Sequence, residues 1–164
     1  MKALFIGGVK SGKSKNAEAF TISHAGNKPY YLATTEFIDE EMAKKIELHK
    51  KQRSDNFITI EESLRLSKNI DTCDDIVLIE CVSIWLNNML YHKHSYEDIF
   101  DEIDTLLESD KSIVFVLNDV GSGIIPDNAL AREFVELSGI IAQKIAARCD
   151  AVYHTVAGIS TKIK

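Results

Sequence analysis

A single glycine-rich segment near the N-terminus constrains this chain most. It satisfies the pattern G-x-x-x-x-G-K-[ST], and its members are Gly7, Gly8, Val9, Lys10, Ser11, Gly12, Lys13 and Ser14. The apolar run 3–6 before it predicts a buried strand. Residues 15–24 after it contain no proline or glycine and predict a helix. A strand, a glycine-rich turn and a helix together form a cradle in which backbone N–H groups converge on phosphates.

This arrangement predicts that the chain binds a nucleoside triphosphate. In such a cradle the lysine, here Lys13, reaches the β- and γ-phosphates, and the hydroxyl of Ser14 takes one Mg²⁺ position. The alternative is a chance match in a glycine-rich turn. The correct flanking segments and four fixed positions out of eight favour the phosphate-binding interpretation.

The rest of the chain alternates between apolar runs and helical segments. Further strands are predicted at 30–34, 57–60, 76–79, 113–117 and 151–156, with a short terminal strand at 161–163. Helices are predicted at 39–53, 83–92, 96–108 and 129–148. Continuous apolar strands separated by helices favour an α/β fold of the P-loop NTPase type, with three layers and a mostly parallel central sheet flanked by helices. At 164 residues, the expectation is one nucleotide-binding catalytic domain over 1–164.

Composition excludes several other classes of protein. The chain is 45% hydrophobic and 27% charged, which is ordinary for a globular protein. A formal charge of −6 argues against a nucleic-acid-binding surface. No apolar run approaches the roughly 20 residues needed to span a bilayer, and the early first strand leaves no room for a signal peptide. The three cysteines form no C-x-x-C pair, which favours reduced thiols and a cytoplasmic location.

Open parallel sheets bind ligands at the carboxyl ends of their strands. This rule selects Thr34 and Thr35, Glu80, and residues 118–123 as candidate site residues besides the glycine-rich segment. Glu80 ends an apolar run, as the acid of a Walker B element does, where it orients Mg²⁺ or its water shell. Asp119, at the end of another apolar run, is the rival candidate, and a helix-start acid without a ligand is the structural alternative.

One histidine lies on a predicted ligand-facing stripe. Met42, Ile46, His49 and Arg53 recur at spacings of four, three and four residues, so they share one face of the helix predicted over 39–53. A half-buried structural histidine is the simpler interpretation of His49. Arg53 on the same face, with two lysines beside His49, favours a polyphosphate site instead. A neutral imidazole next to phosphorus can act as a nucleophile or as a base.

Several segments, in order along nearly the whole chain, resemble one family. This family is the cobinamide kinase/cobinamide phosphate guanylyltransferases of cobalamin assembly. The similar segments are the glycine-rich motif, Tyr31-Leu32-Ala33-Thr34, the histidine segment 39–53, Phe57-x-Thr59-x-Glu61, Leu78-Ile79-Glu80-Cys81, Trp85-Leu86-x-Asn88, residues 118–126 with Leu130-Ala131-Arg132-x-Phe134, and residues 156–164. The chain departs from the family's pattern at Lys10, where arginine is usual, at Phe57 for tryptophan, at Asp119 for glutamate, and at Val135, where an arginine usually follows the phenylalanine.

The resemblance implies two reactions at one nucleotide site. The first passes the γ-phosphoryl group of ATP or GTP to the hydroxyl of the aminopropanol arm of adenosylcobinamide. In the second, the family's histidine, which corresponds to His49, attacks the α-phosphorus of GTP, and cobinamide phosphate then captures the GMP group to give adenosylcobinamide-GDP. The resemblance also implies Mg²⁺ held by Ser14 and Glu80, a closed homo-oligomer such as a trimer, and nucleotide contacts from residues 7–14, Ala33, Thr34, Thr35, Lys50, Lys51, Gln52, Arg53, Glu61 and Glu80.

Two other functions remain possible from the residues alone. A different small-molecule P-loop kinase would have no use for a nucleophilic histidine. A GTP-dependent switch would generally carry Asn-Lys-x-Asp to recognise guanine, and this sequence has no such motif.

Overall fold

The computed structural model describes residues 1–36 and 55–164, and the helix predicted over 39–53 lies outside them. The elements in chain order are β1 (Lys2–Gly7), α1 (Lys13–His24), β2 (Tyr30–Ala33), β3 (Ile58–Glu61), α3 (Leu66–Ile70), β4 (Val77–Glu80), α4 (Val82–Tyr91), α5 (Tyr96–Glu108), β5 (Ile113–Asn118), α6 (Ala129–Arg148), β6 (Ala151–Val156) and β7 (Ile159–Lys162).

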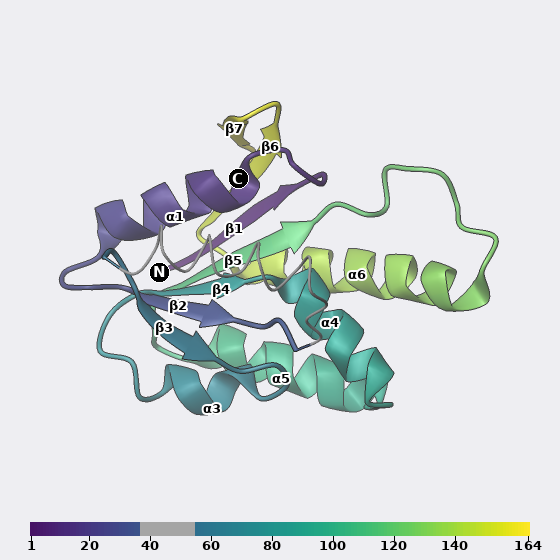
Figure 1. Ribbon diagram of the computed structural model, residues 1–164, viewed down its shortest axis with the longest axis horizontal. Coiled ribbons are helices and arrows are strands. Elements are labelled where there is room, and N and C mark those ends of the chain that lie inside the picture. The colour runs from purple at the N-terminus through teal and green to yellow at the C-terminus, as the bar shows by residue number, and fades with distance from the viewer. Residues whose placement is uncertain (37–54) are drawn as a thin grey trace.

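The strands form one sheet in the order β3-β2-β4-β5-β1-β6-β7 (Figure 1). All neighbouring pairs are parallel except β6 with β7, which are antiparallel and joined by a tight turn. The prediction of a mostly parallel α/β sheet is therefore confirmed.

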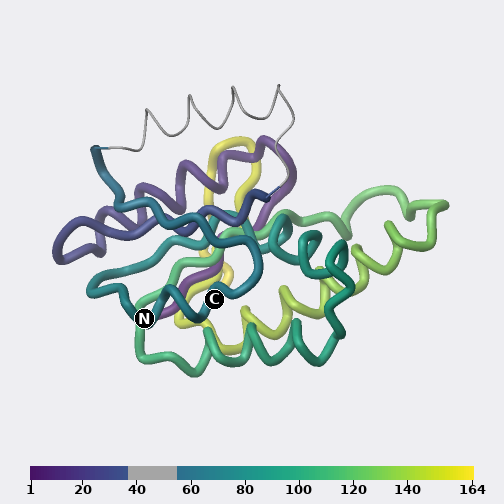
Figure 2. Tube along the Cα trace, turned by 60° about the horizontal axis from the view of Figure 1, so that its bottom comes forward, coloured from purple at the N-terminus to yellow at the C-terminus, as the bar shows by residue number. Residues whose placement is uncertain are grey.

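Helices cover both faces of the sheet, which gives three layers (Figures 1 and 2). Side chains of β5 alternate between the two cores, as the pleat of a strand requires. Phe115 and its second neighbours along the strand pack with Trp85 and side chains of α3, α5 and α6, whereas Val114 and Val116 pack with Ala17 of α1. Burial on both faces explains why this strand is apolar at every position from 113 to 117.

Two elements differ from the sequence predictions. The short helix α3 was not expected. The Glu62 carboxylate accepts the N–H groups of Leu64 and Arg65, at 2.9 and 3.0 Å, in the turn just before it, and the Glu102 carboxylate of α5 accepts the N–H of Ser67 in its first turn at 2.6 Å. The last strand runs over 159–162 rather than 161–163, because the turn before it consists of only two residues, Ala157 and Gly158, both with positive φ. Two such residues form the hairpin turn that matches strand twist.

The segment between β5 and α6 extends beyond the sheet, and so does the first part of α6 (Figures 1 and 2). Three large apolar side chains there are exposed: Ile124 is 96% exposed, Ile125 80% and Leu130 64%. We refer to residues 119–130 as the arm. Among the described helices, none is long and apolar enough to cross a membrane.

Truncating a side chain should lower the free energy of unfolding more on a central strand, which is buried on both faces, than on an edge strand. Phe115→Ala, in the completely buried centre of β5, should reduce the free energy of unfolding by about 3 to 5 kcal/mol. Ile58→Ala, on the edge strand β3 and 42% exposed, should cost less than about 1.5 kcal/mol. Urea unfolding of both variants measures the difference. Equal losses would contradict the central position assigned to β5.

Candidate active site

The glycine-rich segment lies at the carboxyl edge of the sheet, between β1 and α1. The last residue of β1, Gly7, is level with Asn118 at the end of β5 and with Thr155 on β6. Gly12 begins α1 as its N-cap with φ of 94°, a left-handed conformation that residues with a side chain rarely adopt. The loop therefore places the N-terminus of α1, with its partial positive charge, at the edge where the parallel strands end.

Lys13 is folded back over this loop. Its side chain is buried, with only 6% exposed, and its Nζ donates a hydrogen bond to the carbonyl oxygen of Gly8 at 3.2 Å. An ammonium group with several donors in this position can hold the loop and also face an anion bound within it.

The clearest polar contact of the site joins the loop to β4. The hydroxyl of Ser14 donates to Oε1 of Glu80 at 2.7 Å, across 66 residues of sequence. Asp119, the rival acid, is engaged elsewhere, because its carboxylate accepts the Gly121 N–H at 3.2 Å and the Ser122 hydroxyl at 2.6 Å. The geometry therefore favours Glu80 over Asp119 as the acid beside the loop.

A hydroxyl and a carboxylate are the hard oxygen donors that Mg²⁺ prefers. Ser14 and Glu80 fit that ion chemically. Within the described ranges, no group of three or more His, Cys, Asp and Glu side chains could hold a metal ion. A magnesium ion here would therefore depend on further oxygens from water and from nucleotide phosphates, as is usual for this ion.

The other predicted residues of the carboxyl edge form a row across three strands. Ala33 at the end of β2 is level with Glu80 on β4 on one side and with Glu61 on β3 on the other. Thr34 and Thr35 follow Ala33 directly. The structure thus brings Ala33, Thr34 and Glu80 together, and places Glu61 one strand further out, on the exposed edge of the sheet.

Hydrogen bonds of Thr34 and Asn88 to backbone groups connect the segments at this edge of the sheet. The Thr34 N–H bonds to the carbonyl of Glu80 at 3.1 Å, and its hydroxyl accepts the Cys81 N–H at 2.9 Å. Nδ2 of Asn88, on α4 and 1% exposed, donates to the carbonyls of Thr34 at 2.7 Å and Ser63 at 3.2 Å. The sequence alone predicts no role for Asn88. An amide among the apolar residues of a buried helix was the available signal, because such a group needs a partner.

The cysteines offer no alternative nucleophile. Burial raises the pKa of the Cys81 thiol, next to Glu80, and the Glu80 charge raises it further. Burial also raises the pKa of Cys73, and that of Cys149 to about 12. All three thiols are therefore protonated near neutral pH and pack as small apolar groups.

Part of the predicted site is not described by the structure. His49, Lys50, Lys51, Gln52 and Arg53 lie outside the described residues. The proposed nucleophile and the cations beside it remain predictions from the sequence.

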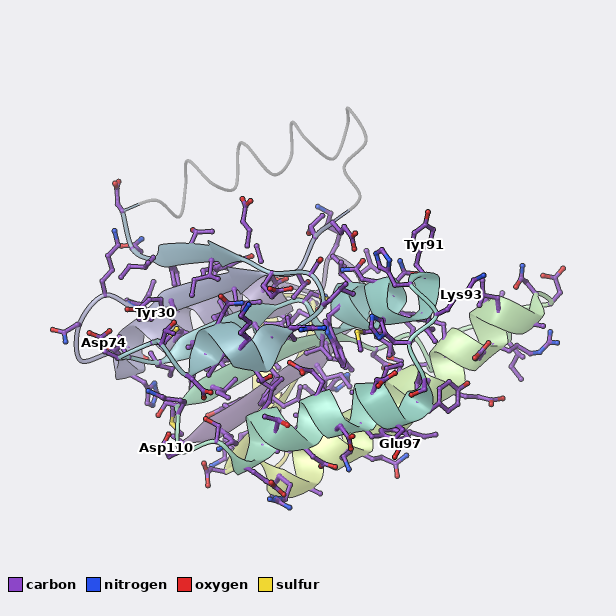
Figure 3. All side chains as sticks on the ribbon, turned by 90° about the horizontal axis from the view of Figure 1, so that it is seen from below. Tyr30, Asp74, Tyr91, Lys93, Glu97 and Asp110 are labelled. Atoms are coloured by element: carbon purple, nitrogen blue, oxygen red, sulfur yellow. The ribbon has the colours of Figure 1, made fainter. Side chains whose placement is uncertain are left out.

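A separate cavity of about 280 Å³ lies at the opposite, amino edge of the sheet. Figure 3 shows Tyr30 and Asp74 at that edge, far from Tyr91 and Lys93 beyond the carboxyl edge. The acids there are used structurally: Tyr30 donates to Asp74 at 2.9 Å, and Asp75 accepts the N–H groups of Gly26 and Ile76. Burial tends to raise the pKa of the Asp75 carboxyl, but hydrogen bonds from backbone N–H groups hold that pKa below its ordinary value. This cavity is not part of the candidate site.

Comparison with known proteins gives a match over almost the whole chain. The family model described as "Cobinamide kinase / cobinamide phosphate guanyltransferase" matches residues 3–163. The bifunctional adenosylcobalamin biosynthesis protein CobU of Salmonella typhimurium is 35% identical over 189 residues, covering 100% of both chains. CobU of Escherichia coli is 33% identical, again over 100% of both, and CobP of Pseudomonas aeruginosa is 33% identical over 100% of this chain and 98% of its own.

Solved structures support the fold. The flagellar accessory protein FlaH from Methanocaldococcus jannaschii superposes with a TM-score of 0.50 at 14% identity, covering 99% of this chain and 77% of its own. An ATPase from a bacterial type III secretion system gives a TM-score of 0.53 at 12% identity, covering 98% and 56%. At such identities only the fold is shared.

The contact between Ser14 and Glu80 predicts which acid supports magnesium. Glu80→Gln keeps the size of the side chain but removes its charge, and should weaken the apparent Mg²⁺ affinity for nucleotide binding by roughly 10- to 100-fold. The matched variant Asp119→Asn should stay within about twofold of the wild type, because its carboxylate serves its own loop. Magnesium titrations with a fluorescent GDP measure both constants. A larger loss in Asp119→Asn would reverse the assignment.

Proposed function

The chain belongs to the cobinamide kinase / cobinamide phosphate guanyltransferase family, and we propose that it catalyses both reactions of that name with one phosphate loop. Relatives named bifunctional match this chain over 98 to 100% of their own length, which supports the proposal. The observation that carries the proposal is the Ser14–Glu80 hydrogen bond at the glycine-rich loop, within a chain that matches the family over residues 3–163.

Residues 1–164 then work as one nucleotide-binding catalytic domain. Residues 7–14 hold the phosphates of ATP or GTP through backbone N–H groups and Lys13. Ala33, Thr34, Thr35, Glu61 and the segment 50–53 complete the nucleotide site. The alignment of Ala33, Glu61 and Glu80 on neighbouring strands supports this set.

In the kinase reaction, the hydroxyl of the aminopropanol arm of adenosylcobinamide attacks the γ-phosphorus of the bound nucleotide. The bond from that phosphorus to the bridging oxygen breaks, the nucleoside diphosphate leaves, and the proton of the hydroxyl is released to water. The chain's contribution is to position the phosphates and to offset the charge that develops on them, which is the main source of catalysis in phosphoryl transfer. Lys13 is a buried cation of this loop.

In the guanylyl transfer, an imidazole nitrogen of His49 attacks the α-phosphorus of GTP. The new nitrogen–phosphorus bond replaces the bond to the bridging oxygen, and pyrophosphate leaves. A phosphate oxygen of adenosylcobinamide phosphate then attacks the same phosphorus and releases the histidine. Two such displacements are easier than one direct transfer, because each has a well-placed nucleophile.

Ser14 and Glu80 are the residues that would hold Mg²⁺, on the chemistry of their oxygens. The ion would supply charge stabilisation on the phosphate oxygens. The substrates are small molecules, and the net charge of −6 gives no support to nucleic-acid binding. Three buried, unpaired cysteines support a reducing compartment, the cytoplasm.

The chain is also proposed to form a closed homo-oligomer, with a trimer as the arrangement to test. The support is the arm, residues 119–130, which extends from the body with Ile124, Ile125 and Leu130 exposed (Figure 1). Large apolar side chains exposed on one projecting segment support a contact surface there, and closed rings bury such surfaces in identical copies.

Sedimentation equilibrium tests the oligomer. The wild type should have the mass of several copies of the 18.4 kDa chain, three in the proposed trimer. The double variant Ile124→Asp, Ile125→Asp should shift it toward the monomer, because two charges would be buried unpaired in the contact. Ile163→Asp, 64% exposed but outside the arm, is the control and should leave the mass unchanged. A monomeric wild type would refute the oligomer proposal.

A labelling experiment separates the proposed function from a plain kinase. The protein incubated with Mg²⁺ and GTP labelled at the α-phosphate should become covalently labelled and release pyrophosphate before any cobinamide is added. The label should survive alkali and be lost in acid, because a phosphoramidate hydrolyses once its nitrogen is protonated. Adenosylcobinamide phosphate should then transfer the label into product, as expected for a covalent intermediate.

The control is His49→Ala, which should take up no label yet still bind GTP, because the phosphate loop is unchanged. Labelling that persists in His49→Ala would place the nucleophile elsewhere. An unlabelled wild type would favour a small-molecule kinase without a covalent step.

A further inference from the structure

The turn between β6 and β7 is packed directly against the phosphate loop. The N–H of Gly158 donates to the carbonyl of Ser11 at 2.7 Å, although 147 residues separate Ser11 from Gly158 by their numbers. A Cβ atom on Gly12 would lie 2.9 Å from the Cα of Gly158, and a Cβ atom on Gly7 would overlap the carbonyl oxygen of Thr155. The loop and the hairpin therefore approach as closely as backbones can.

Asn16, one turn into α1, fixes the hairpin from the other side. Its Nδ2 donates both hydrogens, one to the carbonyl of Gly158 at 3.0 Å and one to the hydroxyl of Ser160 at 2.7 Å. The Ser160 hydroxyl lies 2.7 Å from that of Thr155, which is completely buried. Both polar backbone groups of Gly158 are thus used, its N–H by the loop and its C=O by the helix.

These bonds fix the direction of an amide in the loop. A trans peptide unit is planar, so its C=O and N–H point in opposite directions. Since the Ser11 carbonyl points at Gly158, the N–H of Gly12 in the same peptide unit points away from the hairpin. The N–H groups of such a loop have to converge on the bound phosphates for the loop to work.

We propose that Asn16, Gly158 and Ser160 are positioning residues for the phosphate loop. Asn16 holds the hairpin against α1, and the hairpin in turn holds the Ser11–Gly12 peptide unit in the orientation that binds phosphate. This inference rests on the proposed nucleotide binding and adds to it. The site residues predicted from the sequence include none of the three.

The test compares ligands that do and do not carry phosphates. GDP and guanosine each displace a fluorescent GDP from the protein in the presence of Mg²⁺. Asn16→Ala should weaken GDP by about tenfold, the effect of about one net hydrogen bond, and leave guanosine within twofold. Ser160→Ala, which removes one of the two acceptors, should weaken GDP by about threefold. The double variant should resemble Asn16→Ala alone, because both changes break the same contact.

Two controls make the outcome decisive. Asn87→Ala removes an exposed asparagine from α4 and should change neither ligand. Lys13→Ala should abolish GDP binding. Wild-type affinity for GDP in both the Asn16 and the Ser160 variants would overturn the inference, and so would equal losses for GDP and guanosine. A wild type that does not bind GDP would instead overturn the proposed function, and this inference with it.

Discussion

Parallel pairing of β1 with its two neighbours is the constraint on which the rest of this structure depends. Because β1, β5 and β6 run in the same direction, their carboxyl ends meet at one edge, where Gly7 is level with Asn118 and Thr155. A slip of one residue would turn every side chain of β1 to the opposite face. Leu4 packs in one core and Ala3 and Phe5 pack in the other, so a slip would exchange side chains of different size between two filled cores, and the fit of those side chains specifies the register. The register of β1 with β5 and β6 therefore determines where the phosphate loop lies at the edge of the sheet.

Much of this architecture follows from local sequence patterns. Apolar runs such as 113–117 mark strands buried on both faces, and the glycine-rich motif marks the turn between the first strand and helix. The positions of Glu80 and Asp119 after such runs also follow from the sequence. The sequence does not show which of these two carboxylates contacts Ser14, because that contact joins residues that are distant in the chain.

Other features of the structure could not be predicted from the sequence, for related physical reasons. The helix α3 has only five residues, too few for a periodic signal, and the carboxylate that accepts an N–H of its first turn comes from Glu102, 35 residues further along the chain. Asn88 serves two carbonyls from loops that are distant in sequence, and only the folded chain brings them to it. The contacts of Asn16 with the last hairpin are longer still in sequence, and no spacing rule connects them.

The contact between Ser11 and Gly158 has a consequence for how the protein is made. The ribosome produces β1, the phosphate loop and α1 first, and the hairpin that supports the loop emerges only after more than a hundred further residues. A nascent chain that stops before β6 would contain the whole glycine-rich motif and still lack one of its supports. Nucleotide that favours the supported loop would therefore stabilise the completed molecule rather than its early fragments, since a ligand stabilises only the state that binds it.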